Sequence, residues 1–340
     1  KSFDSIQNWK TLISNYKKKG YFDRNKISVI FISQFFFKSN FLQILEFLKN
    51  NNIKIASFLN PGVLIYENKL YFKKNFFFFK AKIFSFLYKY KQSIRYIYWV
   101  SLLNKIKKRK KLDFDYIFVA GKKYKKKFYE NYSKKRTKII NFNSFDYSTF
   151  LNSKPQKFNY KYAVYLAEPG PGNFSDSSFL NLSGVVENMS IYEDLCKFFK
   201  MIEKKLDLKI LICSHPKSSN DKTLYKGFKT FQRQTPEIIS NCEFVMHKQS
   251  TAMSYAILNY KPIIFLMNND FMLKDHGQYK YSLYLAKYFK TCLFNINQTI
   301  DIQKFKKNIK VDTKIYNKFI KNYLSSNRFK KNYQIISDNI

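Results

Sequence analysis

The α/β character of the chain is clearest in the stretch Leu211-Ile212-Cys213-Ser214-His215-Pro216-Lys217-Ser218, where an apolar run gives way to a polar loop. A second such loop, His247-Lys248-Gln249-Ser250-Thr251, follows the apolar run 244–246 and opens a helix-like segment at 251–259. A strand, a polar loop and a helix N-terminus in succession are how α/β folds build anion and nucleotide sites. Two of the three histidines lie in these loops, so the pattern predicts an enzyme with a phosphorylated or nucleotide-linked substrate.

Apolar runs elsewhere extend this pattern into two α/β halves. In the first half they predict buried strands at 27–32, 53–58, 116–121 and 138–142. In the second half they predict strands at 162–167, 208–213, 244–246 and 261–266. Strands that alternate with helical patterns are typical of parallel sheets. We therefore expect two α/β units with a cleft between them.

The same patterns predict the domain limits. Residues 1–152 are expected to form an N-terminal α/β domain with a basic, aromatic, helical insertion, and residues 162–300 a nucleotide-binding domain. The polar residues 152–161 between them are typical of a linker. Residues 301–340 have a basic and mostly helical pattern, and we expect these C-terminal helices to pack back on the first domain.

The composition favours a folded chain with anionic partners. Of 340 residues, 45% are hydrophobic, and 62 Lys and Arg against 23 Asp and Glu give a formal charge of +39. Such a charge attracts nucleic acid, anionic lipid or nucleotide-sugar phosphates. The abundant Lys, Asn, Ile, Phe and Tyr residues are also what A/T-rich codons encode, so a genome bias on solvated faces explains the charge about as well as a selected basic surface does.

The most hydrophobic segment, residues 76–111, is interrupted repeatedly by Lys and Arg. Its longest uncharged run is 96–104, which is far shorter than the ~20 residues of a membrane span. Two interpretations remain open: a core helix with a charged outer face, or a segment that lies on an anionic membrane surface. The four cysteines lack metal or redox spacing, which predicts reduced thiols and a cytoplasmic location. The second interpretation of residues 76–111 would add a peripheral association with the inner membrane.

Three loops of the second half follow predicted strands, where ligands bind in open parallel sheets. His215 is held by Pro216 and could donate to a phosphate oxygen, with Lys217 adding charge; an ordinary strand-ending turn is the alternative. Ser250 and Thr251 could bind phosphate at a helix start, or simply cap that helix. His247, three residues before Ser250, is harder to explain as part of a cap.

Glu168 leaves an apolar strand into the loop Glu168-Pro169-Gly170-Pro171-Gly172. A carboxylate there could act as general base on an acceptor hydroxyl, and Gly170 would let substrate approach the backbone. The alternative is a turn with a solvated Glu168, and Asp176 is a weaker candidate base. The pattern Asp113-Phe114-Asp115 precedes a strand rather than following one, which indicates a structural role. We find no metal-ligand spacing and no dinucleotide or Walker fingerprint, so no cofactor is expected.

The polar loops resemble the motif set of a known class of enzymes. His215-Pro216 after one strand and Ser250-Thr251 after another resemble motifs of bacterial GT-B sialyltransferases and of related capsule and lipooligosaccharide glycosyltransferases. The stretch Ser250-Thr251-Ala252-Met253-Ser254-Tyr255-Ala256, followed by Lys261-Pro262-Ile263-Ile264-Phe265, is similar to surface-polysaccharide biosynthesis proteins. The resemblance covers residues 162–267 and the first half only in general layout.

The resemblance implies a GT-B-like α/β fold, with two Rossmann-like domains whose parallel sheets face a cleft. It also implies a CMP-linked nonulosonic acid or Kdo-type donor, whose phosphate would be bound by His215 with Pro216 and by Ser250 with Thr251. Those sialyltransferases often have two acids and a glycine at the base position, whereas this chain has Ala167-Glu168-Pro169-Gly170, with one acid.

The resulting hypothesis is a metal-independent glycosyltransferase of bacterial surface polysaccharide or lipooligosaccharide synthesis. Residues 1–152 would face an oligosaccharide or lipid-linked acceptor. The catalytic residues would be Glu168 and His215, and the substrate-binding residues would be Gly170, Pro216, Lys217, His247, Ser250 and Thr251. Two alternatives are a nucleotide-sugar epimerase of the same fold and a non-enzymatic nucleic-acid-binding protein, although the basic runs 105–111 and 122–127 lack an RNA-binding signature.

Overall fold

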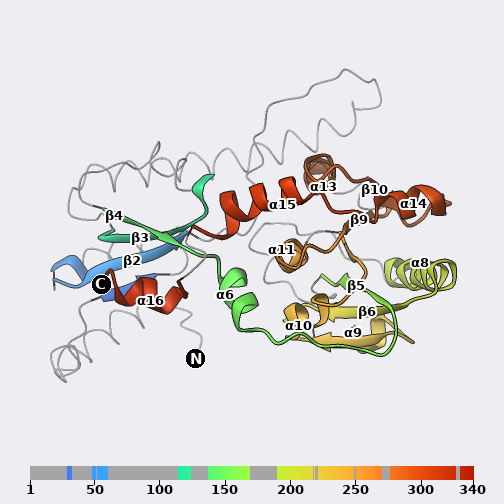
Figure 1. Cartoon of the computed structure of the whole chain (residues 1–340), viewed down its shortest axis with the longest axis horizontal. Helices are drawn as coiled ribbons and strands as arrows, with labels where there is room; N and C mark the ends of the chain where they lie inside the picture. Colours follow the sequence, from blue (N-terminus) through green and yellow to red (C-terminus); the bar gives the residue numbers. More distant parts are fainter. Residues whose placement is uncertain are drawn as a thin grey trace, which may run out of the picture.

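A computed structural model of the chain describes residues 29–32, 48–50, 52–59, 114–123, 137–168, 190–216, 218, 221–248, 250–269, 276–326 and 330–340. The basic zone 76–111 lies outside these residues. Figure 1 shows two sheets at opposite ends of the view, with helices α6 (Phe145–Asn152) and α15 (Thr313–Phe319) between them.

The first sheet has four parallel strands in the spatial order β1-β2-β3-β4. The strands are β1 (Val29–Ile32), β2 (Lys54–Leu59), β3 (Tyr116–Ala120) and β4 (Lys138–Phe142). Each strand lies within two residues of an apolar run that predicted it. The core of this sheet is aromatic, because Phe118 and Phe142 are fully buried with their ring centroids 5.3 Å apart.

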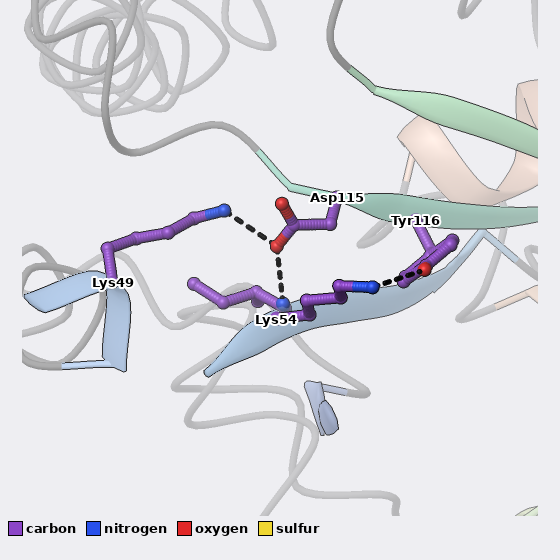
Figure 2. Close-up of polar contacts among 5 residues, drawn as sticks. Lys49, Lys54, Asp115 and Tyr116 are labelled. Carbon is purple, nitrogen blue, oxygen red and sulfur yellow. Dashed lines mark hydrogen bonds and ion pairs between the residues drawn. The ribbon is translucent and has the colours of Figure 1, made fainter. Parts of the chain in front are cut away.

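The role of Asp115 at the start of β3 is structural rather than metal-binding. Figure 2 shows its carboxylate at the beginning of β3, where it accepts a hydrogen bond from the Ile55 backbone N–H at 2.7 Å and pairs with the Lys49 ammonium at 2.6 Å. These contacts join β3 to β2 and to the residues before β2. This is the structural role expected for Asp115, whereas Asp113 lies outside the described residues.

The second sheet has six parallel strands in the order β10-β9-β8-β5-β6-β7. They are β5 (Tyr162–Leu166), β6 (Lys209–Ser214), β7 (Lys229–Gln232), β8 (Val245–His247), β9 (Ile263–Met267) and β10 (Leu293–Asn295). All residues of β5 are buried, which is typical of a parallel strand with both faces covered.

Helices cover both faces of the second sheet. One face packs against α10 (Thr235–Ile239), α11 (Met253–Leu258), α13 (His276–Tyr288) and α15. The other packs against α8 (Ser190–Leu206) and α14 (Ile302–Asn308). A short helix, α9 (Asp221–Leu224), precedes β7. The apolar period of α8 predicted its buried stripe, and Leu195, Phe199 and Ile202 lie there with at most 1% exposed surface.

The C-terminal helices contact both sheets. Phe305 of α14 and Phe319 of α15 lie in the cores around the second sheet. The π-helix η2 (Ile320–Leu324) continues α15 toward the first sheet, where the Gly121 N–H donates to Ser326 Oγ at 2.8 Å. Helix α16 (Asn332–Ser337) lies near the first sheet in Figure 1, and its residue Ile335 belongs to the core of that sheet. The exact domain limits remain a prediction.

None of the helices in the described part of the chain is long and apolar enough to cross a bilayer. The four cysteines are all free thiols.

Candidate functional site

The three predicted loops begin at one edge of the second sheet. Strand β5 lies between β8 and β6, and Leu166 is level with both His247 and Cys213. Because all three strands are parallel, their carboxyl ends share an edge. With a strand spacing of about 4.8 Å, the loops after β6 and β8 begin roughly 10 Å apart, with Glu168 between them. The topology therefore brings to one edge residues as far apart in the sequence as Glu168 and Thr251, which are 83 positions apart.

An ion pair joins two of these loops. The Lys248 ammonium lies 2.8 Å from Glu168 Oε2, and the two side chains retain only 7% and 20% of their exposed surface. Lys248 comes directly after β8, and Glu168 comes two residues after β5. A buried pair of this kind fixes where its members lie, because each charge would be costly to leave alone. The structure thus aims the Glu168 carboxylate toward the loop after β8.

Sequence reasoning gave no role to Lys248. The available signal was its position, since it is the second residue after a predicted strand and lies between the candidate residues His247 and Ser250. That signal was hidden by the 62 Lys and Arg residues of the chain, which make a single lysine uninformative.

His247 lies inside the sheet rather than on its surface. Its side chain has 0% exposure, and its ring packs 4.8 Å from that of Phe265 on β9. The Ser250 backbone N–H donates to His247 Nδ1 at 3.2 Å. Burial lowers the pKa of His247 to about 3, so the imidazole is neutral at physiological pH. Direct contact with a ligand, which the sequence predicted for His247, would require the turn above it to open.

The turn after β8 differs from the predicted helix start. Helix α11 begins at Met253 rather than at Thr251, and its N-cap residue, Ala252, makes no side-chain capping bond. The reason is that Ser250 forms a turn before the helix begins. Its Oγ accepts a hydrogen bond from the Ala252 N–H at 3.3 Å, and its carbonyl oxygen accepts one from the Met253 N–H at 3.2 Å. Ser250 and Thr251 are therefore turn residues, and the Ser250 N–H is already engaged by His247.

Among the described residues of this turn, Thr251 is the exposed one. The N–H groups of Ser250, Ala252, Met253 and Ser254 all donate within the turn or to His247. Within the described residues the Thr251 N–H has no acceptor. Thr251 is therefore the residue of the turn that can offer both an N–H and a hydroxyl to an anion.

The loop after β6 is a tight turn fastened to β7. The Ser218 N–H donates to the His215 carbonyl at 2.9 Å, with Pro216 at the second position that β-turns favour for proline. The Gln232 side chain donates to the carbonyls of His215, Pro216 and Ser218, at 3.4, 3.2 and 2.8 Å. The strand-ending turn that was the alternative interpretation of His215 and Pro216 thus lies at the candidate site itself. Gln232 supports this turn, and sequence reasoning missed it. Gly170, Asp176 and Lys217 lie outside the described residues.

Asparagines extend the polar edge across β9 and β10. Asn295 Nδ2 donates to Asn269 Oδ1 at 2.6 Å, and Asn297 Nδ2 donates to Asp194 Oδ2 at 2.6 Å. By strand spacing this cluster begins two to three strands from β5, about 10–14 Å away. Asparagine is frequent throughout this chain, so the sequence did not single these residues out. Among the described residues no group of His, Cys, Asp and Glu is arranged to hold a metal ion.

No protein-family model and no curated protein matches the chain. Solved structures do resemble it. UDP-GlcNAc 2-epimerase from Methanocaldococcus jannaschii has a TM-score of 0.51 and 13% identity, over 99% of this chain and 83% of the epimerase. Acinetobacter baumannii MurG has a TM-score of 0.40 and 7% identity, over 99% and 81%. The calicheamicin glycosyltransferase CalG4 has a TM-score of 0.41 and 8% identity, over 91% and 69%. The last two scores are too low to carry an argument.

The comparisons bear on the fold alone. The two parallel sheets with their covering helices, together with the similarity to the epimerase, confirm the predicted α/β fold of GT-B-like type. The similarity to the epimerase shows a shared fold, and the activity of this chain is a matter for proposal.

Proposed function

We propose that this protein is a glycosyltransferase that binds a nucleotide sugar at the carboxyl edge of β8, β5 and β6. The observation that carries the proposal is the convergence there of Glu168, His215 and the turn at Ser250 and Thr251, on adjacent strands. The asparagine cluster extends this polar edge to β10, four strand spacings from β6, which is about 19 Å. An extended ligand with phosphate between its nucleoside and its sugar suits an edge of that length.

In this proposal each residue has a distinct task. Glu168 accepts the proton of the acceptor hydroxyl, and Lys248 holds the Glu168 carboxylate in place. The His215 imidazole and the Thr251 N–H donate to the departing nucleotide phosphate, which spreads its developing charge. Fixed donors of this kind perform the task of a divalent cation, so the proposed reaction needs no metal.

The donor we propose is CMP-linked, a nonulosonic acid or a Kdo-type sugar, and the acceptor is an oligosaccharide or a lipid-linked sugar on an anionic membrane surface. The support for this finer proposal is the sequence resemblance of His215-Pro216 and Ser250-Thr251 to the motifs of bacterial sialyltransferases. Comparing the binding of CMP, UDP, GDP and ADP to the purified protein tests the identity of the nucleotide.

A nucleotide-sugar epimerase is the second candidate. It is favoured by the solved structure of the M. jannaschii enzyme, which is named a UDP-GlcNAc 2-epimerase and overlaps 99% of this chain. An epimerase converts its nucleotide sugar without an acceptor, whereas a transferase releases nucleotide in proportion to acceptor added.

The test is to incubate the purified protein with nucleotide sugars, with and without acceptor glycans, and to follow free nucleotide and sugar configuration. Glycosyl transfer predicts acceptor-dependent nucleotide release that Glu168→Gln reduces by at least 100-fold, as expected for loss of a general base. Glu243→Gln is a matched control, because Glu243 is exposed at the opposite, amino end of β8. Acceptor-independent epimerisation would establish the second candidate. Steeply salt-dependent nucleic-acid binding without turnover would overturn both in favour of a nucleic-acid-binding protein.

A further inference from the structure

The imidazole of His247 accepts a hydrogen bond from the turn after β8, which is the candidate phosphate turn. The Ser250 N–H is a donor, so the His247 Nδ1 that receives it at 3.2 Å carries no proton. The ring proton must then lie on Nε2. That tautomer is fixed by the structure of the turn, since a backbone N–H cannot change from donor to acceptor.

The bond determines which donors the turn presents. By accepting from the Ser250 N–H, His247 keeps that group directed into the protein, and among the described residues of the turn the Thr251 N–H is left without an acceptor. The turn is also held at both ends. Lys248 pairs with Glu168 before it, and Ser254 Oγ donates to Asp146 Oδ2 at 2.6 Å after it.

The Nε2 atom gives a second, independent observation. It is fully buried and has no hydrogen-bond partner among the described residues. An unsatisfied buried donor destabilises the folded state, and an apolar side chain of similar size would avoid that cost. The imidazole is therefore a poor choice for packing against Phe265 alone, and its advantage lies at Nδ1.

We propose that His247 is a positioning residue, which sets the affinity for the nucleotide phosphate by holding the turn so that Thr251 faces the ligand. The inference rests on the proposed function, since it concerns the phosphate subsite of the same enzyme. It replaces direct substrate contact by His247 with an indirect effect through a backbone N–H.

Two substitutions separate the hydrogen bond from the packing. In His247→Asn the side-chain oxygen can lie near the position of Nδ1 and accept from Ser250, whereas His247→Leu fills a similar volume without an acceptor. We expect His247→Leu to weaken nucleotide binding about three- to tenfold, the effect of one lost hydrogen bond, and His247→Asn to bind within about twofold of the natural protein. The measurement is calorimetric titration with the nucleotide that binds best among CMP, UDP, GDP and ADP.

Phe265→Leu is the matched control, because it disturbs the ring packed against His247 and leaves the bond to Ser250 in place. It should lower the melting temperature without changing the nucleotide affinity. A His247→Leu protein that folds and binds as tightly as the natural one would overturn the inference.

A measurement on the natural protein keeps the inference testable if His247→Leu does not fold. With 15N-labelled histidine, only three residues contribute signals. The inference predicts a histidine with an unprotonated Nδ1 that does not titrate between pH 5 and 8; a protonated Nδ1 or an ordinary titration would contradict it. If the natural protein binds none of the four nucleotides, the proposed function fails, and this spectrum still decides the arrangement of the turn.

Discussion

At the scale of single residues, the pair formed by Lys248 and Glu168 is the interaction that defines the candidate site. It connects the loops after β8 and β5 at 2.8 Å and is largely shielded from water. Each of the two charges is costly to bury, and this desolvation cost is offset mainly by the attraction to the partner charge. Removing one partner should therefore be worse than removing both.

The first prediction follows from this dependence. Lys248→Met should cost about 3 kcal/mol of unfolding free energy, the lower end for a buried pair, since a fifth of the Glu168 side chain is exposed. The double variant Lys248→Met/Glu168→Gln should be more stable than Lys248→Met alone. Urea denaturation of the natural protein, Lys248→Met, Glu168→Gln and the double variant measures the coupling free energy between the two residues. Strictly additive losses of unfolding free energy would show that the pair contributes nothing to stability.

The second prediction concerns the pH dependence caused by His247. Its pKa in the folded protein is about 3, below the ordinary value of 6.5. The unfolded chain therefore binds the proton more readily, so the stabilisation is present above pH 6.5 and is lost as the pH falls toward 3. The natural protein should lose stability relative to His247→Asn between pH 6.5 and 4, as measured by urea midpoints. A constant difference across this range would contradict the buried neutral imidazole.

At the scale of elements, α6 and α11 connect the linker to the turn after β8. Asp146 in the first turn of α6 accepts from Ser254 of α11 at 2.6 Å and from the Tyr255 hydroxyl at 3.5 Å. Burial raises the pKa of Asp146 despite these two hydrogen bonds. The contact thus couples the segment that leaves the first sheet to the helix that follows the candidate phosphate turn.

The third prediction has the opposite sign to that for His247. Because the pKa of Asp146 is raised above 3.8 in the folded protein, its contribution to stability is present below pH 3.8 and is lost as the pH rises through the raised value. Asp146→Asn keeps an acceptor for Ser254 but does not ionise. It should gain stability relative to the natural protein as the pH rises from 4 to 7. Thermal unfolding of both proteins over this range gives the answer, and parallel curves would exclude a buried ionisable Asp146.

The fourth prediction tests the contact between β3 and η2. Gly121 and Gly227 both have positive φ angles, 76° and 86°. A Cβ at Gly121 would overlap the backbone of Asn322 in η2, whereas a Cβ at Gly227 would meet nothing. Gly227→Ala should cost about 1–2 kcal/mol for the left-handed backbone alone. Gly121→Ala should cost a further 1–3 kcal/mol, and equal losses of melting temperature would contradict the close approach of η2 to the first sheet.

At the scale of the whole molecule, the sequence predicted the layout well because both sheets are parallel and buried. Strands covered on both faces are continuous apolar runs, and such runs predicted β1 to β6, β8 and β9 to within two residues. Strands β7 and β10 were missed because they lie at the sheet edges; Lys229-Thr230-Phe231-Gln232 has no fully buried residue. Helix α6 was missed because it is short and sits beside the polar linker.

The candidate site was predictable only in part. A rule about strand ends selected Glu168, His215 and Ser250, and the strand order then placed them at one edge. The ion pair of Lys248 with Glu168 and the hydrogen bonds from Gln232 to the loop after β6 depend on which strands are neighbours and on their register. No local sequence pattern encodes these. The burial of His247 depends on the same register, because its ring packs against a residue of β9.

The most direct test of the central claim is the binding of CMP, UDP, GDP and ADP to the purified protein, followed by calorimetry and thermal unfolding with and without magnesium. We predict that one nucleotide, CMP in the finer proposal, binds without metal and adds about 2.7 kcal/mol of stability at a hundredfold excess over its Kd. His215→Ala should weaken that binding about tenfold or more, and Glu243→Gln should leave it unchanged. Binding of UDP or GDP in place of CMP would keep the site and exclude the sialyltransferase-like donor. No binding of any nucleotide, or equal binding by His215→Ala, would contradict a nucleotide-sugar site at the carboxyl edge of β8, β5 and β6.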